Sequence, residues 1–512
     1  HIEDCVRFTP IRYSIDWRQL AVHLLTSFKL TRQCGLKGFE DVPGGERHTL
    51  HRSGRTRTLL WNPGEFCRSG PIENAAVAAC QLRATVQTSV SAWAARHTDI
   101  IHCLSGGLDS SIVASCLAQA PSKPNVTCLN LYVAASDRDK PVLPNLSKRY
   151  LAKLHRVSSH GDERQFARLV ARACGFQLIE QEKRVEHYDL RRIWDSPLAT
   201  LPTMYVHNID LDATEGRLVG EKNASAVFNG QIGDTVFFTT FQSLGALDYA
   251  YQHRFGRHFI AEVARASALS RESVWLVTGE AVRHGIFRRP KPPIFDYLKS
   301  PQLMPSHAID WITQRDIEHP WVQAAGRLAP GKRAHVEGLA SSGLFYYMSF
   351  FRERMASSVY PLASQPVIEL CLRIPTYVLL FNGISRGLAR LAFADVLPKE
   401  VRDRTVKGYN FSFYQHVVQA NLDYVRESLL DGLLVSEGVL DREKLDQYLQ
   451  RDAPFLTVTA GQILAYLSAE AWARQWDNIM RQSATADAQN ASLGSTSMQP
   501  ENQHRSSMRV MG

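Results

Sequence analysis

The segment Ser105–Ser111, which reads Ser-Gly-Gly-Leu-Asp-Ser-Ser, carries the strongest chemical signal in this sequence. An apolar run, Ile100–Leu104, precedes it and an amphipathic run, Ile112–Leu117, follows it, which predicts a strand, a tight turn and a helix. Glycine lets the chain turn sharply, and the first N–H groups of a helix have no intrahelical acceptor, so they attract an anion. The pyrophosphate of ATP fits such a turn, and Asp109 beside it would hold a Mg²⁺ ion against the phosphate oxygens.

A second glycine-rich turn, Asn229–Asp234, follows the short apolar run Ala226–Phe228. Ligands of parallel sheets bind at the carboxyl ends of the strands, so we expect the two turns to lie side by side. Asp234 would then face Asp109 across a bound triphosphate. Two carboxylates are what a Mg²⁺–nucleotide site requires.

Two other motifs resemble functional loops less closely. Gly326–Arg333 has the glycine spacing of a Walker A loop, but an arginine stands where that loop needs Ser or Thr. Gly383–Gly387 has the Gly-x-Ser-x-Gly spacing of a hydrolase nucleophile elbow, and Tyr377–Phe381 before it has the composition of a strand. We interpret Ser385 instead as the N-cap of a helix over Arg386–Ala394.

Strands and helices that alternate along the chain would position these turns. Apolar runs predict strands at 99–104, 126–133, 177–181 and 226–228, and helices at 72–96, 110–120 and 163–175. In the first helix, Leu82, Val86, Val90 and Trp93 lie on one face. The alternation predicts an α/β fold with a parallel sheet covered by helices on both faces. After about residue 240 the pattern is mostly helical.

Composition limits the class of protein. The chain has 512 residues, of which 45% are hydrophobic and 21% charged. Its nine cysteines show no zinc spacing, so we expect free thiols and a cytoplasmic location. No apolar run approaches the ~20 residues that a membrane span needs. The net charge of +9 comes from scattered basic residues, so we expect neither a nucleic-acid nor a membrane partner.

The sequence suggests three regions. Residues 1–66 have short apolar stretches and glycine turns typical of the β-rich end of a domain, and because the chain starts at His1 we expect the rest to precede it. Residues 67–482 hold both glycine-rich turns and form the main domain. Residues 483–512 are rich in Ser, Gln, Asn and Ala and nearly free of aromatic side chains, which predicts a disordered tail.

The two turns resemble the ATP-pyrophosphatase (PP-loop) domain of the asparagine synthetase superfamily, and the resemblance covers roughly residues 20–480. Within that superfamily the chain looks most like the macrocyclases that close the ring of lasso peptides. The residues that carry this closer resemblance are Tyr360–Glu369, Arg386, Arg390, Leu397-Pro398, Arg404 and Lys407-Gly408.

The resemblance implies a mechanism and a set of site residues. Such enzymes activate a carboxylate with ATP and Mg²⁺, and lasso peptide cyclases join an Asp or Glu side chain of a leader-free precursor peptide to the peptide's N-terminal amine. A leader peptidase is the expected partner enzyme. By position, the nucleotide would be bound by Ser105, Gly106, Gly107, Asp109, Ser110 and Gly230, the metal by Asp109 and Asp234, and the developing negative charge would be stabilised by Lys407.

The resemblance also implies the fold. The parallel sheet would lie between helices, the C-terminal half would be mostly helical, and residues 1–66 would be the remnant of a glutamine-amidotransferase-like domain. Asparagine synthetases release ammonia at an N-terminal cysteine, and Cys5, which follows four other residues, does not have that position. Relatives that close β-lactams use a glutamate four residues before a proline that matches Pro361, but here Ser357 stands there, so the general base is unassigned.

Two alternatives remain open. One is a glutamine-dependent amidotransferase similar to asparagine synthetase. The other is a catalytically silent scaffold that binds a peptide. The silent scaffold predicts loss of the phosphate-site residues, whereas Ser105, Asp109, Asp234 and Lys407 are all present.

Overall fold

Five parallel strands form the framework that positions both glycine-rich turns. The computed structural model describes residues 2–8, 11–25, 31–138, 158–159, 162–289, 303–310, 318–342, 350–405, 407–408, 411–450 and 460–496. The strands, in their spatial order, are β6 (Gln177–Lys183), β4 (Asn125–Val133), β3 (Asp99–Cys103), β7 (Ala226–Asn229) and β8 (Ser357–Val359). Every neighbouring pair is parallel, as predicted. The short strand β8 was not predicted.

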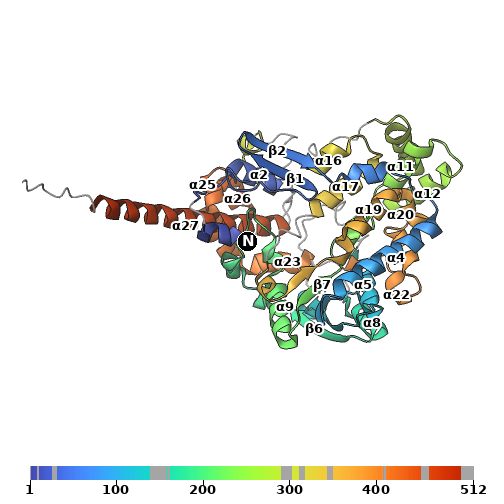
Figure 1. Cartoon of the computed structure of the whole chain (residues 1–512), viewed down its shortest axis with the longest axis horizontal. Coiled ribbons are helices and arrows are strands. Elements are labelled where there is room, and N and C mark those ends of the chain that lie inside the picture. The colour runs from blue at the N-terminus through green and yellow to red at the C-terminus, as the bar shows by residue number, and fades with distance from the viewer. Residues whose placement is uncertain are drawn as a thin grey trace, which may run out of the picture.

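Helices cover both faces of this sheet (Figure 1). One face packs against α4 (Ala75–Ala94), α5 (Leu108–Ala118) and α8 (Arg164–Cys174), and the other packs against α9 (Ile209–Lys222). Successive strand residues point to opposite faces, so Ile100 and Phe228 face the first set whereas Ile101 and Val227 face α9. Burial on both faces explains why these strands read as continuous apolar runs.

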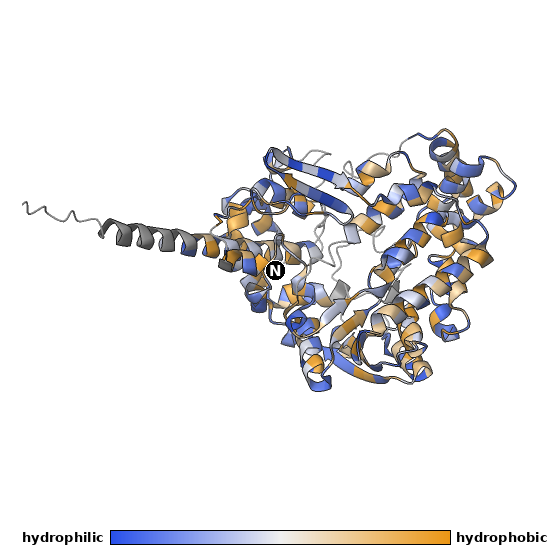
Figure 2. Ribbon diagram, viewed as in Figure 1, coloured by the Kyte–Doolittle hydropathy of each residue, from blue (hydrophilic) through white to orange (hydrophobic). Residues whose placement is uncertain are grey.

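The chain after β7 is mostly helical, as expected. The α- and π-helices described in it up to residue 402 are α10 (Gly233–Val236), α11 (Leu244–His253), α12 (Phe259–Ser270), α13 (Val274–Glu280), the π-helix Ala281–Ile286, α15 (Ser306–Asp310), α16 (Pro320–Ala325), α17 (Pro330–Ser342), α19 (Gln365–Arg373), α20 (Thr376–Leu379), α21 (Gly387–Ala392) and α22 (Lys399–Arg402). Several of these helices extend the apolar core on the α5 face of the sheet. Figure 2 shows hydrophobic and hydrophilic residues alternating along these helices.

A second core joins the two ends of the described chain. It contains the buried side chains Tyr13, Leu20 and Leu36 together with Trp472 and Trp476. The helices that build it are α2 (Trp17–Leu25), α23 (Phe411–Ala420), α24 (Leu422–Leu430), α25 (Leu433–Ser436), α26 (Arg442–Tyr448) and α27 (Ala460–Thr496). The aromatic rings of Tyr13 and Trp476 lie 4.9 Å apart, measured between centroids. Sequence patterns had indicated no such contact.

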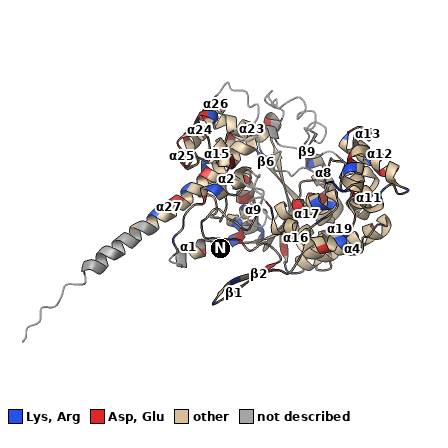
Figure 3. Ribbon diagram, turned by 90° about the horizontal axis from the view of Figure 1, so that it is seen from above, with Lys and Arg blue, Asp and Glu red and all other residues tan. Residues whose placement is uncertain are grey.

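Residues 1–66 are less rich in strands than expected. They contain the hairpin of β1 (Glu46–His51) and β2 (Gly54–Leu59), together with α1 (Ile2–Phe8), α2 and the start of α3 (Pro63–Arg68). Figure 3 shows this hairpin extending from the body of the molecule, with basic and acidic residues interspersed along the described elements. The origin of residues 1–66 in an amidotransferase-like domain stays a prediction.

The C-terminal helix α27 continues to Thr496, past residue 483 where disorder was expected to begin. Alanines recur in this stretch, and alanine extends a helix that packing has already nucleated. Residues 497–512, the rest of the expected tail, lie outside the described residues. None of the helices that the structure describes is both long and apolar enough to cross a membrane.

The remaining short elements connect these units. They are α6 (Ala135–Arg138), β5 (Ser158–Ser159), β9 (Lys407–Gly408), and the 3₁₀ helices Val185–His187, Leu190–Asp195, Tyr205–His207, Phe351–Arg354, Pro361–Ala363 and Phe381–Gly383. Strands β5 and β9 pair in parallel, Ser158 with Lys407. All nine cysteines are free thiols, as expected.

Candidate active site

Two strand–turn–helix units meet at the carboxyl end of the sheet. Cys103, the last residue of β3, pairs with Asn229, the last residue of β7, so the two turns begin at the same level. Asp109 is the second residue of α5 and Asp234 is the second residue of α10. The structure therefore brings together the two aspartates that the sequence had paired.

Glycine is required where the two turns touch other backbone. Gly106 has a φ of +80°, and a Cβ there would lie 2.7 Å from the backbone nitrogen of Ala167 in α8. At Gly230, a Cβ would lie 2.4 Å from the backbone nitrogen of Ser110. No side chain fits at so short a distance, so the second turn can rest on the first turn of α5 only because residue 230 is glycine.

Hydrogen bonds fix the first turn. The hydroxyl groups of Ser105 and Ser110 lie 3.0 Å apart, and the Gly107 amide donates to Ser105 Oγ at 3.2 Å. Beneath the turn, the imidazole of His102 lies 2.9 Å from the Ser110 carbonyl oxygen and 3.2 Å from that of Phe228. Burial lowers the pKa of His102 to about 4, although both carbonyl contacts act in the opposite direction. A neutral imidazole has a single N–H, so His102 donates to one of these two carbonyl oxygens and links β3 either to α5 or to β7.

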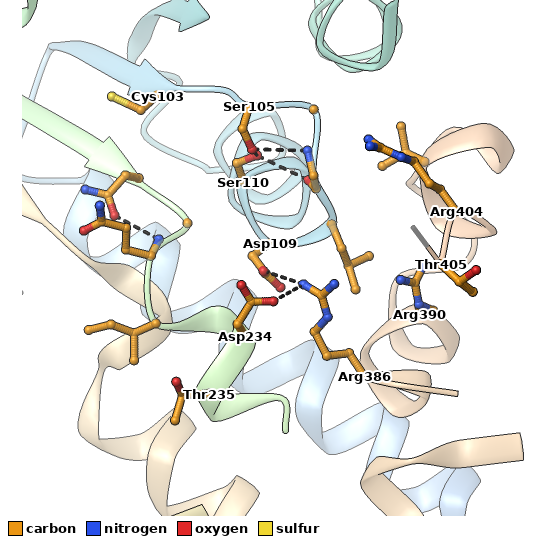
Figure 4. Close-up of a pocket in the computed structure, with 18 residues that line it drawn as sticks. Cys103, Ser105, Asp109, Ser110, Asp234, Thr235, Arg386, Arg390, Arg404 and Thr405 are labelled. Carbon is orange, nitrogen blue, oxygen red and sulfur yellow. Dashed lines mark hydrogen bonds and ion pairs between the residues drawn. The ribbon is translucent and has the colours of Figure 1, made fainter. Parts of the chain in front are cut away.

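A cavity of about 500 Å³ opens over these turns. Its wall is formed by the first turn, the second turn and three arginines from the C-terminal half, Arg386, Arg390 and Arg404. Figure 4 shows Asp109 and Asp234 side by side, with Arg386 reaching between them and the other two arginines beyond it. The volume lies in the range of small-molecule sites, and the arginines suit an anionic ligand.

The two carboxylates share one cationic nitrogen. Nη1 of Arg386 lies 2.7 Å from Oδ2 of Asp109 and 2.6 Å from Oδ1 of Asp234. Burial by itself lowers the pKa of Arg386, but the two carboxylates outweigh burial and raise it. Thr239 donates a hydrogen bond to the same Asp234 oxygen at 3.2 Å, which fixes the orientation of that carboxylate.

This pair of carboxylates fits a Mg²⁺ ion. Oxygens of Asp109 and Asp234 already share a cation, and carboxylate oxygen is the ligand that Mg²⁺ prefers. Over the part of the chain that the structure describes, no group of three or more His, Cys, Asp or Glu residues is placed to hold a metal. Two carboxylates match the usual case in which Mg²⁺ takes its other ligands from water and substrate phosphates.

The other two arginines are held by contacts of their own. Arg390 donates to the backbone carbonyl oxygens of Arg402 and Ser385. Burial, together with the charge of Arg386, lowers the pKa of Arg390 to about 10, so it remains charged at neutral pH. Arg404 forms an ion pair with Glu163, and its guanidinium lies 4.3 Å from the centre of the Phe166 ring.

Lys407 is located by its backbone, in β9, two residues beyond Thr405 of the cavity wall. Its side chain lies outside what the structure describes, so its catalytic role stays a prediction. Strand β9 follows the segment that carries Arg404 and Thr405 after a single residue outside the described part of the chain.

Two residues with nucleophilic side chains are unsuited to nucleophilic attack. Cys103 lines the cavity, but its thiol donates to Glu215 at 2.9 Å, and burial together with that carboxylate raises the pKa of Cys103 well above its usual value. Ser385 lies in no nucleophile elbow, because Thr376–Leu379 before it is helical. It is not an N-cap either, since Arg386 caps α21, which begins at Gly387.

The sequence located the turns but missed the arginines as site residues. The structure brings Ser105, Gly106, Gly107, Asp109, Ser110, Gly230 and Asp234 together around the cavity. Arg386, Arg390 and Arg404 follow the turns by more than 150 positions. The only sequence signal that could have identified them as site residues is the family resemblance, which these arginines help to carry.

Comparison with known families agrees with this geometry. The family model described as asparagine synthase matches residues 81–474, which include both turns and all three arginines. No curated protein matches the chain. The match covers well over half of the 512 residues. The chain therefore belongs to the asparagine synthase family of ATP-dependent amide-forming enzymes.

Proposed function

We propose that this protein is an ATP-dependent lasso peptide cyclase. It would adenylate an Asp or Glu side chain of a leader-free precursor peptide and join that side chain to the peptide's N-terminal amine. The observation that carries the adenylation step is the meeting of Asp109 and Asp234 at a cavity lined by arginines. The choice of peptide is supported by the resemblance of Tyr360–Glu369 and of the segment from Arg386 to Gly408 to lasso peptide cyclases.

In the first half-reaction, a carboxylate oxygen of the peptide attacks the α-phosphorus of ATP. The bond to the β-phosphate oxygen breaks and pyrophosphate leaves. The Ser105 hydroxyl and the first N–H groups of α5, which belong to residues that line the cavity, would bind the departing phosphates. Magnesium held by Asp109 and Asp234 would offset their negative charge.

In the second half-reaction, the N-terminal amine attacks the acyl carbon of the adenylate. AMP leaves, the nitrogen loses a proton, and an isopeptide bond closes the ring. Lys407 would stabilise the negative charge on the phosphate during both steps. Holding the amine against the adenylate contributes on the order of 7–11 kcal/mol, because the enzyme removes most of the entropic cost of their encounter.

A panel of synthetic peptides tests this function. Each peptide has a free N-terminus and one Asp or Glu, placed at successive positions along the panel, and is incubated with ATP and Mg²⁺. We expect mass spectrometry to show one panel member lighter by one water, and chromatography to show AMP and pyrophosphate. The same peptide with an acetylated N-terminus should not cyclise. Abundant ADP would refute the adenylation chemistry.

A parallel incubation addresses the amidotransferase alternative. Free aspartate is supplied with ATP and either glutamine or ammonia. We expect no asparagine, because the proposed nucleophile is the peptide's own amine. Asparagine formed in the absence of any cyclised peptide would favour the amidotransferase instead.

A further inference from the structure

The guanidinium of Arg386 lies where a divalent cation is expected. One nitrogen, Nη1, contacts Oδ2 of Asp109 at 2.7 Å and Oδ1 of Asp234 at 2.6 Å. The side chains of Arg386 and Asp109 are 11% and 10% exposed, so their contact forms largely away from bulk water, where screening is weak, whereas the Asp234 side chain is 41% exposed. Two adjacent carboxylates repel each other, and here an internal cation offsets that repulsion.

The local backbone conformation orients the Arg386 side chain toward the cavity. Arg386 adopts the left-handed conformation, with φ 57° and ψ 31°, which residues other than glycine rarely adopt. A Cβ at position 387 would lie 2.2 Å from the Phe381 carbonyl oxygen, so only glycine fits after it. The segment Gly383–Gly387, whose spacing resembles a nucleophile elbow, therefore presents Arg386 to the cavity.

The carboxylates do not use the whole guanidinium. Among the described residues, Nε of Arg386 is buried and has no hydrogen-bond acceptor. A buried donor without an acceptor is unfavourable, so an anionic ligand that reached this nitrogen would be bound more strongly. Arg386 thus occupies the position of a cation between two carboxylates, and its Nε is a donor that an anion could use once the side chain moves.

We infer that Arg386 competes with the divalent cation for Asp109 and Asp234, so that metal binds well only when nucleotide phosphates draw the guanidinium away. The inference rests on the nucleotide-binding part of the proposed function. One nitrogen and one metal ion cannot both occupy the space between the same two oxygens. Binding of metal and nucleotide is therefore coupled, and the coupling must act equally in both directions.

Binding of Mn²⁺ in the absence of nucleotide and peptide tests the inference, with free Mn²⁺ measured by electron paramagnetic resonance. We expect Arg386→Met to bind Mn²⁺ roughly 5–150-fold more tightly than the unmodified protein, the usual range of coupling between two ligands. Arg390→Met is the matched control, because Arg390 lines the same cavity but donates to backbone carbonyl oxygens. Arg390→Met removes the same charge from the cavity wall. We expect it to raise the affinity for Mn²⁺ less, and this smaller increase measures the long-range electrostatic contribution.

Two further variants make the result decisive. Arg386→Asn should show the same increase in affinity for Mn²⁺. Asparagine tolerates a positive φ, so this variant is used if the Arg386→Met protein does not fold. Asp234→Asn, combined with Arg386→Met, should remove the gain. Unchanged Mn²⁺ affinity in both Arg386 variants, a gain as large in Arg390→Met, or a gain that survives Asp234→Asn would each overturn the inference.

The readout separates this inference from the proposed function. Binding of Mn²⁺ requires neither a peptide nor turnover. A protein that shows the gain but cyclises no member of the peptide panel supports the inference and counts against the cyclase. A protein that cyclises peptide without showing the gain supports the cyclase and overturns the inference.

Discussion

Asp109 and Asp234 hold one guanidinium in the structure, and in the proposed reaction they would hold Mg²⁺ instead. We expect Asp109→Asn and Asp234→Asn each to abolish exchange of radiolabelled pyrophosphate into ATP, because an amide lacks the charge that retains the metal. Asp395→Asn is the control, since Asp395 is 75% exposed and pairs with Arg83 on the surface. Near-normal exchange in either site variant would remove that residue from the metal site.

A substitution at Ser385 distinguishes the hydrolase hypothesis, in which Ser385 is the nucleophile, from a site that depends on Arg386. The Ser385 hydroxyl is buried and has no hydrogen-bond partner among the described residues. We expect Ser385→Ala to keep full pyrophosphate exchange and to leave the free energy of unfolding unchanged or up to about 1 kcal/mol higher, because an unsatisfied buried hydroxyl is lost. Exchange and urea denaturation measure the two quantities. Loss of activity in the folded variant would restore the hydrolase hypothesis.

At the scale of elements, the site depends on the close approach of the second turn to α5. A Cβ at Gly230 would lie 2.4 Å from the Ser110 nitrogen, so Gly230→Ala must displace one of the turns. A shift of 1 Å at reacting groups can cost about 100-fold in rate, and we expect a loss of that order in pyrophosphate exchange.

Gly279 in α13 offers a matched control for this substitution. A Cβ at Gly279 has no heavy atom within 4 Å. Gly279→Ala should keep activity and raise the free energy of unfolding by roughly 0.5–1 kcal/mol, since alanine favours a helix more than glycine does. If Gly230→Ala is as active as Gly279→Ala, the two turns do not position the phosphates.

Sequence patterns predict elements whose signal is local. Strands β3, β4, β6 and β7 were found from their apolar runs, and helix α8 ends at Gly175 with a φ of +70° as its glycine signal indicates. Strand β8 was missed because Ser357–Val359 offers only three residues and no apolar run. Trp93, expected on the apolar face of α4, is 43% exposed, and its indole N–H donates to Ser364.

Local sequence patterns likewise identified some residues of the candidate site and missed others. The turn residues were identified because glycine, serine and aspartate act within a few positions of one another. The role of Arg386 could not be inferred locally, because it depends on the packing of Gly387 against Phe381 and on a contact with α5. Side chains that reach a site from a distant element leave no periodic pattern in the sequence.

At the scale of the whole molecule, buried histidines make stability depend on pH. Burial lowers the pKa of His102 from 6.5 to about 4. Between these values the unfolded chain binds more protons than the folded one, so the contribution is complete above about pH 6.5 and is lost as pH falls toward 4. A shift of this size corresponds to a loss of about 3 kcal/mol in the free energy of unfolding as pH falls from above 6.5 to below 4. Burial likewise lowers the pKa of His207 and of His319 to about 4.

Urea unfolding at about pH 7 and about pH 5 measures this dependence. We expect a lower free energy of unfolding at the lower pH, and a smaller difference between the two pH values in His102→Gln. His187→Gln is the control, because the His187 side chain is 74% exposed. An equal pH dependence in all three proteins would show that His102 does not titrate as described.

The core shared by Tyr13 and Trp476 has a consequence for the order in which the protein is made. A ribosome completes the parallel sheet and its covering helices well before it adds Trp472 and Trp476, so the sheet and these helices can fold during synthesis. The segment that contains Tyr13, Leu20 and Leu36 must wait, with apolar side chains exposed, until the last helix emerges. Contacts between such distant residues form slowly, because a very long loop has to close first. Until that loop closes, we expect the apolar side chains of both segments to be exposed, which favours aggregation and the binding of chaperones.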